Sequence, residues 1–327
     1  ASGFSGVVRV DSAHEVVFCS AYGLADRAHA WPNTVDTLFA TASATKGLTA
    51  LTVMSLIERG ALALDTTARS LLGDDLPLVG DDVTIEHLLA HRSGIGDYLD
   101  EDGSDLEDYL MPVPVHVLDS TARYLTVLDR HEPVFSAGER FDYNNAGYVL
   151  LALLAERATG TVFPDLVRTL VCEPAGMRDT AFLRSDELPA DAARGYLSVD
   201  GLRTNVLHLP VLGSGDGGAF STAADLSALW RALFAGRIIT PGHLAEMVRP
   251  RSHWPDQSYV SSADHRRYGL GFHLHATSPT LWLKGYDTGV SFASVHDPPS
   301  SITWTVISNW TDGAWPIVRV LRDHFAT

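Results

Sequence analysis

The feature that most constrains this chain is a run of small and apolar residues, 41–54, that opens with the spacing Ser43-x-x-Lys46. Together with the stop signal Arg59-Gly60, it predicts a helix to about residue 58. Ser43 and Lys46 then lie one turn apart on one face, with Ser43 in the first turn, where the helix dipole is positive. A serine needs a proton acceptor to become a nucleophile, and a lysine is a base only where its neutral form is favoured. The pair is therefore useful only in an enclosed pocket, and by itself it often arises by chance.

Strand-forming residues gather at the two ends of the chain. Five strands and a closing helix are predicted: strands over residues 4–10, 15–22, 281–286, 290–296 and 302–308, and the helix over 313–324. This order favours an α+β fold, with an antiparallel sheet built from both chain ends and flanked by helices. We expect residues 1–60 and 211–327 to form this sheet domain.

The residues between these ends carry mainly helical patterning. Helices are predicted over 84–91, 119–128 and 146–159, and a further helix over 221–234 falls within the sheet domain. Thr84 and Thr222 suit the N-cap position, and Gly160 ends the third of these helices. We therefore expect an inserted, mainly helical domain over residues 61–210.

Charge and hydropathy exclude several classes of partner. The 40 acidic and 24 basic residues give a formal net charge of −16 without any Lys/Arg-rich run, so neither a nucleic acid nor an anionic membrane is expected as a partner. The longest apolar piece, residues 148–155, is far shorter than the ~18 residues that suggest a transmembrane segment. No signal peptide is visible in this chain; we expect a soluble protein, of the cytoplasm or the cell envelope, and the compartment stays open. The oligomeric state stays open, as does whether Cys19 and Cys172 pair.

Two further motifs have plainer explanations. Gly213 to Gly218 match Gly-x-Gly-x-x-Gly, but no strand–turn–helix context surrounds them, so they read as a tight cleft wall rather than a dinucleotide site. His87 and His91 stand at i and i+4 without a third ligand, which favours a structural role over a metal site. No cofactor and no metal are expected. A Gly-x-Ser-x-Gly elbow is absent, which argues against an α/β-hydrolase.

Tyr143-Asn144-Asn145 precedes the helix predicted over 146–159. Either asparagine would cap that helix, and the tyrosine would then only pack beside it. In an extended loop, alternatively, Tyr143 and Asn145 point to the same side. A phenol there could relay a proton, and an amide could orient a substrate carbonyl.

Residues 283–289, Leu-Lys-Gly-Tyr-Asp-Thr-Gly, run from a predicted strand into a glycine-bearing turn. They could form simply an edge strand with a tight hairpin. They could also present backbone N–H groups of an exposed strand to a substrate carbonyl.

Taken together, these stretches resemble the serine β-lactamase and penicillin-binding protein superfamily, in its class C-like branch of D,D-peptidases and related esterases. Ser43-x-x-Lys46 matches its first motif and Tyr143-x-Asn145 its second. Further signposts follow in the family's order over nearly the whole chain, at residues 39–46, 88–94, 138–145, 173–177, 217–222 and 268–272. The resemblance implies the family's fold and an acyl-enzyme mechanism.

The third motif departs from the family, whose members show Lys-Thr-Gly or His-x-Gly beside the nucleophile. One alignment, Lys284-Gly285-Tyr286, keeps the lysine and loses the glycine. The other, Tyr286-Asp287-Thr288 followed by Gly289, replaces both, and we favour it because Gly289 then leads into the next strand. Tyr286 would thus contact the substrate, and a phenol in place of a cation disfavours carboxylate-bearing substrates such as penicillins.

By this resemblance Ser43 attacks a carbonyl, Lys46 and Tyr143 share the proton transfers, and Asn145 orients the substrate. Backbone N–H groups of Ser43 and of the strand near Gly289 would form the oxyanion hole. The expected partner is a small molecule: an ester first, an amide or D-peptide second, a β-lactam third. Its pocket walls are expected from residues 97–114 and 252–265. The alternative is a non-hydrolytic, penicillin-recognising binding or sensor protein.

Overall fold

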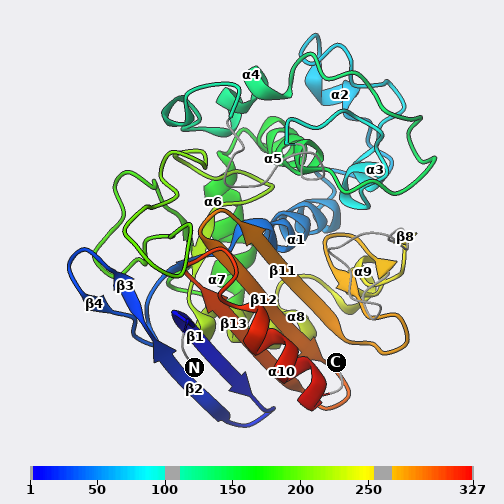
Figure 1. The fold of residues 1–327 in the computed structure, drawn as a ribbon. Coiled ribbons are helices and arrows are strands. Elements are labelled where there is room, and N and C mark those ends of the chain that lie inside the picture. Colours follow the sequence, from blue (N-terminus) through cyan, green and yellow to red (C-terminus); the bar gives the residue numbers. More distant parts are fainter. Residues whose placement is uncertain (1–2, 100–110, 254–266, 326–327) are drawn as a thin grey trace.

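The computed structural model describes residues 3–99, 111–253 and 267–325. Its main element is an eight-stranded antiparallel sheet in the order β2-β1-β13-β12-β11-β10-β9-β8 (Figure 1). The strands are β1 (Gly6–Asp11), β2 (Val16–Tyr22), β8 (Ser252–His253), β9 (Arg267–Tyr268), β10 (His273–Leu274), β11 (Leu281–Asp287), β12 (Val290–Asp297) and β13 (Ile302–Ser308). The two chain ends meet where β1 pairs with β13, with Gly6 opposite Ser308. The predicted α+β class and antiparallel sheet are confirmed, and β8 to β10 extend the sheet beyond the prediction.

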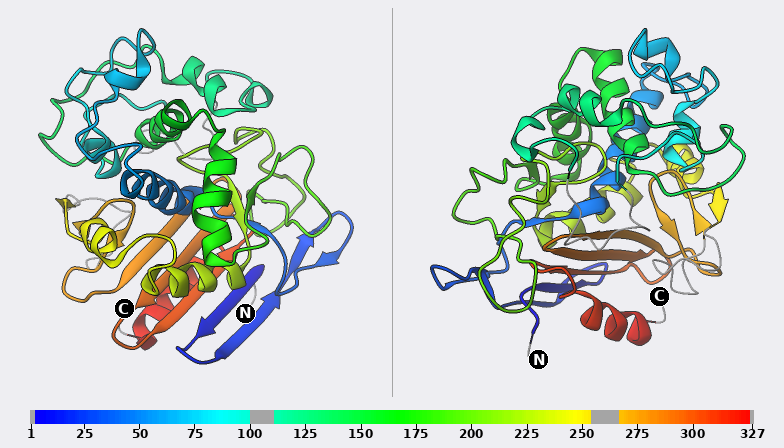
Figure 2. Two further views of the ribbon diagram at one scale, coloured as in Figure 1. Left: turned by 180° about the vertical axis from the view of Figure 1, so that it is seen from behind. Right: turned by 45° about the horizontal axis from the view of Figure 1, so that its top comes forward.

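Helices cover both faces of this sheet (Figure 2). They are η1 (Ala42–Ala44), α1 (Thr45–Glu58), α2 (Arg69–Leu72), α3 (Ile85–Leu89), η2 (Val115–Val117), η3 (Thr121–Tyr124), α4 (Leu125–Leu128), α5 (Asn145–Thr159), α6 (Phe163–Val167), η4 (Arg168–Cys172), α7 (Glu173–Ala175), α8 (Ala223–Phe234), α9 (Pro241–Met247) and α10 (Trp315–Phe325). In both views of Figure 2, α10 lies on one face of the sheet and α1 with α8 on the other. Two smaller sheets pair β3 (Leu24–Asp26) with β4 (Trp31–Pro32), and β7 (Ala219–Ser221) with both β5 (Phe39–Ala40) and β6 (Ala181–Phe182).

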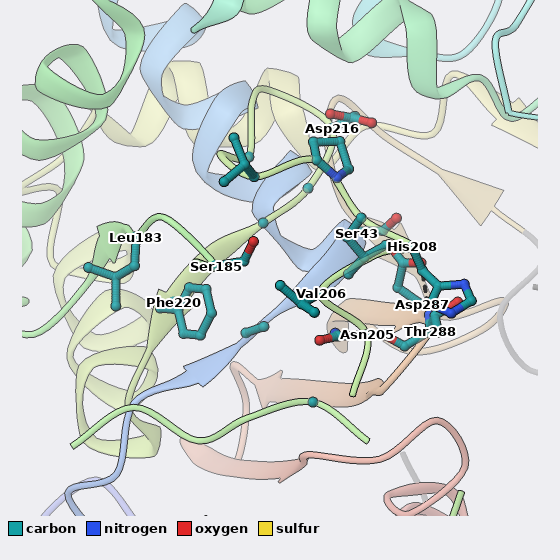
Figure 3. Close-up of a pocket in the computed structure, with 18 of the residues that line it drawn as sticks. Ser43, Leu183, Ser185, Asn205, Val206, His208, Asp216, Phe220, Asp287 and Thr288 are labelled. Carbon is teal, nitrogen blue, oxygen red and sulfur yellow. Dashed lines mark hydrogen bonds between the residues drawn. The ribbon is translucent and has the colours of Figure 1, made fainter. Parts of the chain in front are cut away.

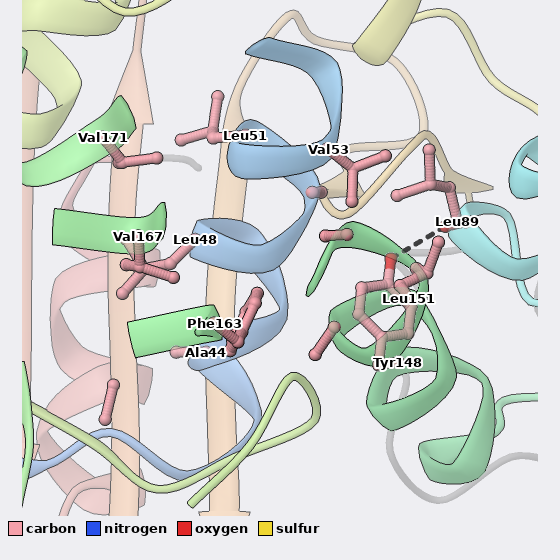
Figure 4. Packing of buried hydrophobic residues seen from close by; sticks show 14 of the residues in the cluster. Ala44, Leu48, Leu51, Val53, Leu89, Tyr148, Leu151, Phe163, Val167 and Val171 are labelled. Atoms are coloured by element: carbon pink, nitrogen blue, oxygen red, sulfur yellow. Dashed lines mark hydrogen bonds between the residues drawn. The ribbon is translucent and has the colours of Figure 1, made fainter. Parts of the chain in front are cut away.

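Helix α1 is the central element of the core. Twelve of its 14 residues are buried, because helices α5, α6 and η4 pack around it and Gly47 contacts Leu283 of β11. Figure 4 shows Leu48 and Leu51 of α1 against Val167 and Val171. A helix enclosed in this way is held rigidly, which fixes the position of the side chains at its first turn.

The helix ends follow from the capping residues that the sequence predicts. Thr84 caps α3 and accepts the N–H of His87, Thr222 caps α8, and Gly160 ends α5 with φ +71°. The helix predicted over 119–128 is instead a 3₁₀ turn followed by a single α turn. The division into two domains stays a prediction, and residues before 210 do reach the sheet region, since Leu38 pairs with Ala192.

The structure bears on whether the cysteines pair and on whether a helix could span a membrane. Cys19 and Cys172 are both free thiols, and burial raises the pKa of Cys172 to about 12. Among the described helices none by itself has the length and apolar character to cross a membrane, although the bent pair formed by residues 145–159 and 163–175 meets both criteria jointly.

Candidate active site

Ser43 stands in η1, the tight turn that leads into α1. The residue before it, Ala42, has φ +45°, a left-handed conformation that costs a non-glycine residue energy and marks a constrained backbone. The turn is tied to β7 from both sides. Thr41 donates its hydroxyl to Ala219 O at 2.9 Å, and Thr45 Oγ1 accepts the Ala219 N–H at 3.1 Å. The serine is therefore held half-exposed on a rigid support.

Lys46 follows one turn later and is only 2% exposed. Its Nζ lies 3.0 Å from Ser43 Oγ, 2.7 Å from Asn145 Oδ1 and 2.8 Å from Asp216 O. A buried ammonium is tolerated only when its N–H groups are all bonded, as they are here.

These three contacts fix the direction of the amine. Asn145 Oδ1 and Asp216 O can only accept, so they always take two N–H groups of Lys46. The remaining position of the nitrogen is thereby aimed at Ser43 Oγ. In the ammonium that position carries a proton, and in the neutral amine it carries the lone pair that can take the serine proton.

Asn145 is the first residue of α5, whose N-terminus is bonded from two directions. Asn144 is the N-cap, and its side-chain oxygen accepts the Gly147 N–H at 2.7 Å. Asp97 accepts the N–H of Asn145 at 2.5 Å and that of Ala146 at 3.0 Å. Both predicted possibilities therefore coexist in this loop, because Asn144 caps the helix while Asn145 contacts Lys46.

Asp216 is a functional residue that the sequence did not reveal. It belongs to the glycine-rich loop that we interpreted as a cleft wall, and its carbonyl oxygen is an acceptor of Lys46. The loop can pack this closely against α5 only because residue 215 is a glycine, since a Cβ there would lie 2.1 Å from Tyr148 O. Burial raises the pKa of the Asp216 carboxyl, while Lys46 and the Tyr98 hydroxyl oppose the rise. The glycines could have indicated a close approach, but not its partner.

Tyr143 lies beside the amine. Lys46 Nζ is 4.9 Å from the centre of the Tyr143 ring. On the buried side the imidazole of His91 lies 4.3 Å from the same ring, and Tyr148 and Tyr268 each lie 4.8 Å from His91. Burial and the nearby Lys46 charge hold the pKa of His91 well below its usual range, so the imidazole is neutral. The structure thus brings Ser43, Lys46, Tyr143 and Asn145 into one cluster.

The strand next to the nucleophile is β11, whose side chains alternate between two faces. Leu283 and Gly285 face α1 and η1. A Cβ added at Gly285 would lie 2.1 Å from Thr41 O, and Leu283 fills the space left by Gly47. The β11 residues that pack against α1 and the Ser43 turn are therefore an aliphatic group and a glycine, to which sequence analysis assigned no role, and Asp287, the next residue on this face, lines a pocket with Ser43.

Lys284 and Tyr286 belong to the opposite face of β11. Lys284 Nζ lies 5.1 Å from the Trp282 ring centre, and the Tyr286 hydroxyl donates to Asp312 Oδ1 at 3.3 Å beside Trp315. The Lys284 and Tyr286 side chains therefore stand on the face of β11 away from η1, and Tyr286 is nevertheless among the residues that line a pocket with Ser43, so its contact with a substrate stays a prediction. The physical reason is the two-residue period of a strand, in which a shift of one position moves a side chain to the other face.

Gly289 sits in the hairpin between β11 and β12, with φ +75°. Its N–H donates to Thr311 Oγ1 at 3.0 Å, so the oxyanion-hole N–H expected from the strand near Gly289 would have to come from a neighbouring residue. In a two-residue hairpin the flanking residues, here Asp287 and Val290, form the hydrogen-bonded pair. The backbone N–H of Tyr286 therefore points away from β12.

Ser43 and Asn145 open onto a pocket of about 110 Å³. In Figure 3 the apolar side chains of Leu183 and Phe220 lie on one side, Asp287 lies on the other, and Ser43 is between them. Of the two segments expected as walls, Leu99 and Met111 do line the pocket, whereas residues 100–110 and 254–266 lie outside the described residues.

The two helical histidines have structural environments. His87 Nδ1 accepts the Thr84 N–H and completes the cap of α3, and His91 packs among the tyrosines. Over residues 3–99, 111–253 and 267–325, no three His, Cys, Asp or Glu side chains are grouped so as to hold a metal ion.

Comparison with known proteins bears on the whole chain. The family described as Beta-lactamase matches residues 2–322. The chain belongs to this β-lactamase family. It is 32% identical over 306 residues to Esterase EstB of Burkholderia gladioli, which covers 82% of this chain and 74% of that protein. It is 28% identical over 288 residues to a D-aminopeptidase of Brucella anthropi, and spans half (50%) of that protein.

The solved structure of a penicillin-binding protein from Bacillus halodurans superimposes with a TM-score of 0.89 at 33% identity, covering 98% of this chain and 96% of that one. The β-lactamase-family fold and the serine hydrolase class predicted from the sequence are confirmed.

Proposed function

We propose that this β-lactamase-family hydrolase cleaves a neutral ester through an acyl-enzyme formed at Ser43. The observation that carries the proposal is the placement of Lys46 Nζ, 3.0 Å from Ser43 Oγ, at a pocket with apolar walls. Lys46 and Tyr143 take the serine proton as Oγ bonds to the carbonyl carbon, and return a proton to the departing alcohol. A water molecule, activated by the same groups, then releases the acid.

The oxyanion hole is assigned to two backbone N–H groups. Ser43 supplies one, because the first N–H groups of a helix have no partner inside the helix. Tyr286 supplies the other, since its N–H points away from β12 and β11 lies beside η1. The tight packing of Gly285 on Thr41 supports this assignment, because it holds β11 beside the nucleophile.

The charges around the pocket favour a neutral substrate over an anionic one. Of the described residues that line it, Arg194 is the single Lys or Arg, and its Nε donates to Asp26 at 2.9 Å. Asp216 and Asp287 also line the pocket. A carboxylate-bearing substrate would meet carboxylates and an occupied guanidinium, so esters rank first, small amides or D-peptides second and β-lactams third.

The shape of the pocket favours an apolar group on the substrate. Leu183, Val206 and Phe220 line the side away from Asp287. Apolar walls with a few fixed polar groups are typical of small-molecule sites, where burial supplies affinity and the polar groups supply orientation. A short acyl chain would fit here.

The test compares p-nitrophenyl butyrate with the anionic β-lactam nitrocefin, for wild type and Ser43→Ala. We expect wild type to turn over the ester, Ser43→Ala to lose at least about 10³-fold in kcat/KM, and nitrocefin to be cleaved slowly. An unchanged rate in Ser43→Ala contradicts the proposal. One stoichiometric, long-lived label by a fluorescent penicillin without ester turnover would favour the binding-protein alternative instead.

A further inference from the structure

Two adjacent residues, Asp97 and Tyr98, reach both acceptors that hold Lys46. Lys46 Nζ donates to Asn145 Oδ1 at 2.7 Å and to Asp216 O at 2.8 Å. Asp97 Oδ2 accepts the backbone N–H of Asn145 at 2.5 Å, and the Tyr98 hydroxyl donates to Asp216 Oδ2 at 2.5 Å. The amine is thus supported from two sides by one dipeptide.

Asp97 acts through the N-terminus of α5. Its two carboxylate oxygens take the N–H groups of Asn145 and Ala146. A negative charge at this end of a helix is favoured by the helix dipole. The backbone of Asn145 is therefore fixed, so that its side chain starts from a set position when it meets Lys46.

Tyr98 acts on the glycine-rich loop. This loop has few side chains of its own to hold it, and it reaches α1 through Gly215 O, which accepts the Thr49 hydroxyl at 2.6 Å, and through Asp216 O. Tyr98 and Asp216 are 8% and 9% exposed, so their hydrogen bond is shielded from water. This bond holds the side-chain carboxyl of Asp216, while the backbone carbonyl of the same residue accepts from Lys46.

We propose that Asp97 and Tyr98 are positioning residues, which act through Asn145 and Asp216 to aim Lys46 Nζ at Ser43 Oγ. The proposal rests on the proposed function, because it concerns the amine that serves Ser43. Tyr98 also lines the pocket, so the test separates the aim of the amine from contact with the substrate.

The pKa of the Asp216 carboxyl gives a second measure of the Tyr98 contact, independent of the reaction rate. Lys46 from α1, Tyr98 from its loop and Tyr124 from η3 face this carboxyl, and Asp287 lies near Tyr124. The Lys46 charge lowers the pKa of Asp216 most, and the hydrogen bond from the Tyr98 hydroxyl lowers it further. Removing it leaves a buried carboxylate with one donor fewer, so Asp216 takes up a proton at higher pH.

The experiment uses Tyr98→Phe, with Tyr196→Phe as its matched control. Tyr196 is also a buried tyrosine, but it is not among the described residues that line the pocket, and its hydroxyl accepts the Arg27 N–H at 2.7 Å instead of holding an acceptor of Lys46. With p-nitrophenyl butyrate we expect Tyr98→Phe to lose about 10-fold to 30-fold in kcat with KM within about twofold, and its pH–rate inflection to move upward. Tyr196→Phe should keep kcat and the pH profile within about twofold.

A double-mutant cycle with Lys46→Met tests whether the effect passes through the amine. Labelling of Ser43 by a fluorophosphonate gives the residual rate. We expect Tyr98→Phe to slow labelling in the wild-type background and to change it less than about twofold in the Lys46→Met background. Asp97→Ala should likewise slow the labelling of Ser43 only when Lys46 is present. The milder Asp97→Asn, which keeps one oxygen acceptor, should slow it less. If Asp97→Ala does not fold, Tyr98→Phe still decides.

Three results overturn the proposal while leaving the hydrolase intact: equal losses in Tyr98→Phe and Tyr196→Phe, a change confined to KM, or an additive effect in the Lys46→Met background. Failure of the proposed function looks different, because wild type itself would then show no Ser43-dependent turnover or labelling.

Discussion

The two faces of the large sheet are packed in different ways. Against α10 the sheet presents an apolar cluster that includes Val10, Trp282 and Trp304, with Val318 from the helix. Against α1 and α8 it also covers buried polar groups, among them Lys46 and His296. Burying apolar surface stabilises a fold directly, whereas each buried polar group loses hydration that its partners only offset.

Strand β11 takes part in both faces, which shows why the third motif was hard to align. Trp282, Lys284 and Tyr286 contribute to the α10 side, and Leu283 and Gly285 to the α1 side. An alignment that is shifted by one residue exchanges the residues assigned to the two faces of the strand. The comparison therefore predicts that changes to the polar groups buried on the α1 side alter chemistry or the response to pH, while changes to the apolar cluster on the α10 side alter stability alone.

The largest effect is expected from Lys46→Met on the α1 side. It removes the group aimed at Ser43 Oγ and leaves Asn145 Oδ1 and Asp216 O without this donor. We expect kcat/KM for p-nitrophenyl butyrate to fall about 10⁴-fold, or about 5.5 kcal/mol. Circular dichroism controls for folding, and a loss smaller than tenfold would contradict the role of the amine.

On the α10 side, Trp304→Ala should change stability and leave catalysis alone. The side chain is fully buried, with its ring 5.0 Å from that of Trp282. We expect the free energy of unfolding to drop by about 4 kcal/mol, measured by urea denaturation, with kcat per folded molecule within twofold of wild type. A large fall in kcat of the folded variant would break the division between the faces.

Acid should weaken the α1 side through His296. Its ring lies 5.7 Å from Trp230 of α8, and burial lowers its pKa from 6.5 to about 4. Because the depressed pKa belongs to the folded state, the stability is present above pH 6.5 and is lost as the pH falls toward 4. The expected loss is about 3 kcal/mol. Urea denaturation at pH 7 and pH 4 measures it, and His296→Phe should lose correspondingly less; equal losses would exclude His296 as the cause.

A paired substitution on β11 sharpens the comparison at the site itself. Gly285→Ala places a Cβ 2.1 Å from Thr41 O and must push β11 from the nucleophile turn, whereas Lys284→Ala shortens a side chain on the other face. We expect about a 100-fold fall in kcat for Gly285→Ala, near 2.7 kcal/mol, and less than threefold for Lys284→Ala. The reverse order of effects would favour the alignment that keeps Lys284.

What the sequence predicted well depends on local geometry. Ser43 and Lys46 share a helix face at fixed spacing, and Asn145 begins a helix beside its capping residue. The strands from both chain ends have clear alternation or dense β-branched composition. In such segments neighbours in the sequence largely determine the structure.

What the sequence could not give depends on contacts between distant segments. Asp216 meets Lys46 from 170 positions away, and Tyr98 meets Asp216 across 118. No local pattern marks such a pair, because the contact exists only once the loops have packed against α1. The face of β11 on which the Tyr286 side chain lies was hard to predict for another reason, since it depends on a one-residue frame that only the hairpin register fixes.

The central claim is that Ser43 becomes acylated. The most direct measurement is mass spectrometry of the protein quenched during turnover of p-nitrophenyl butyrate, followed by peptide mapping. The account predicts one butyryl group per chain, on the peptide that contains Ser43, and none in Ser43→Ala. An acyl group on another residue, or ester turnover that persists without acylation of Ser43, would contradict it.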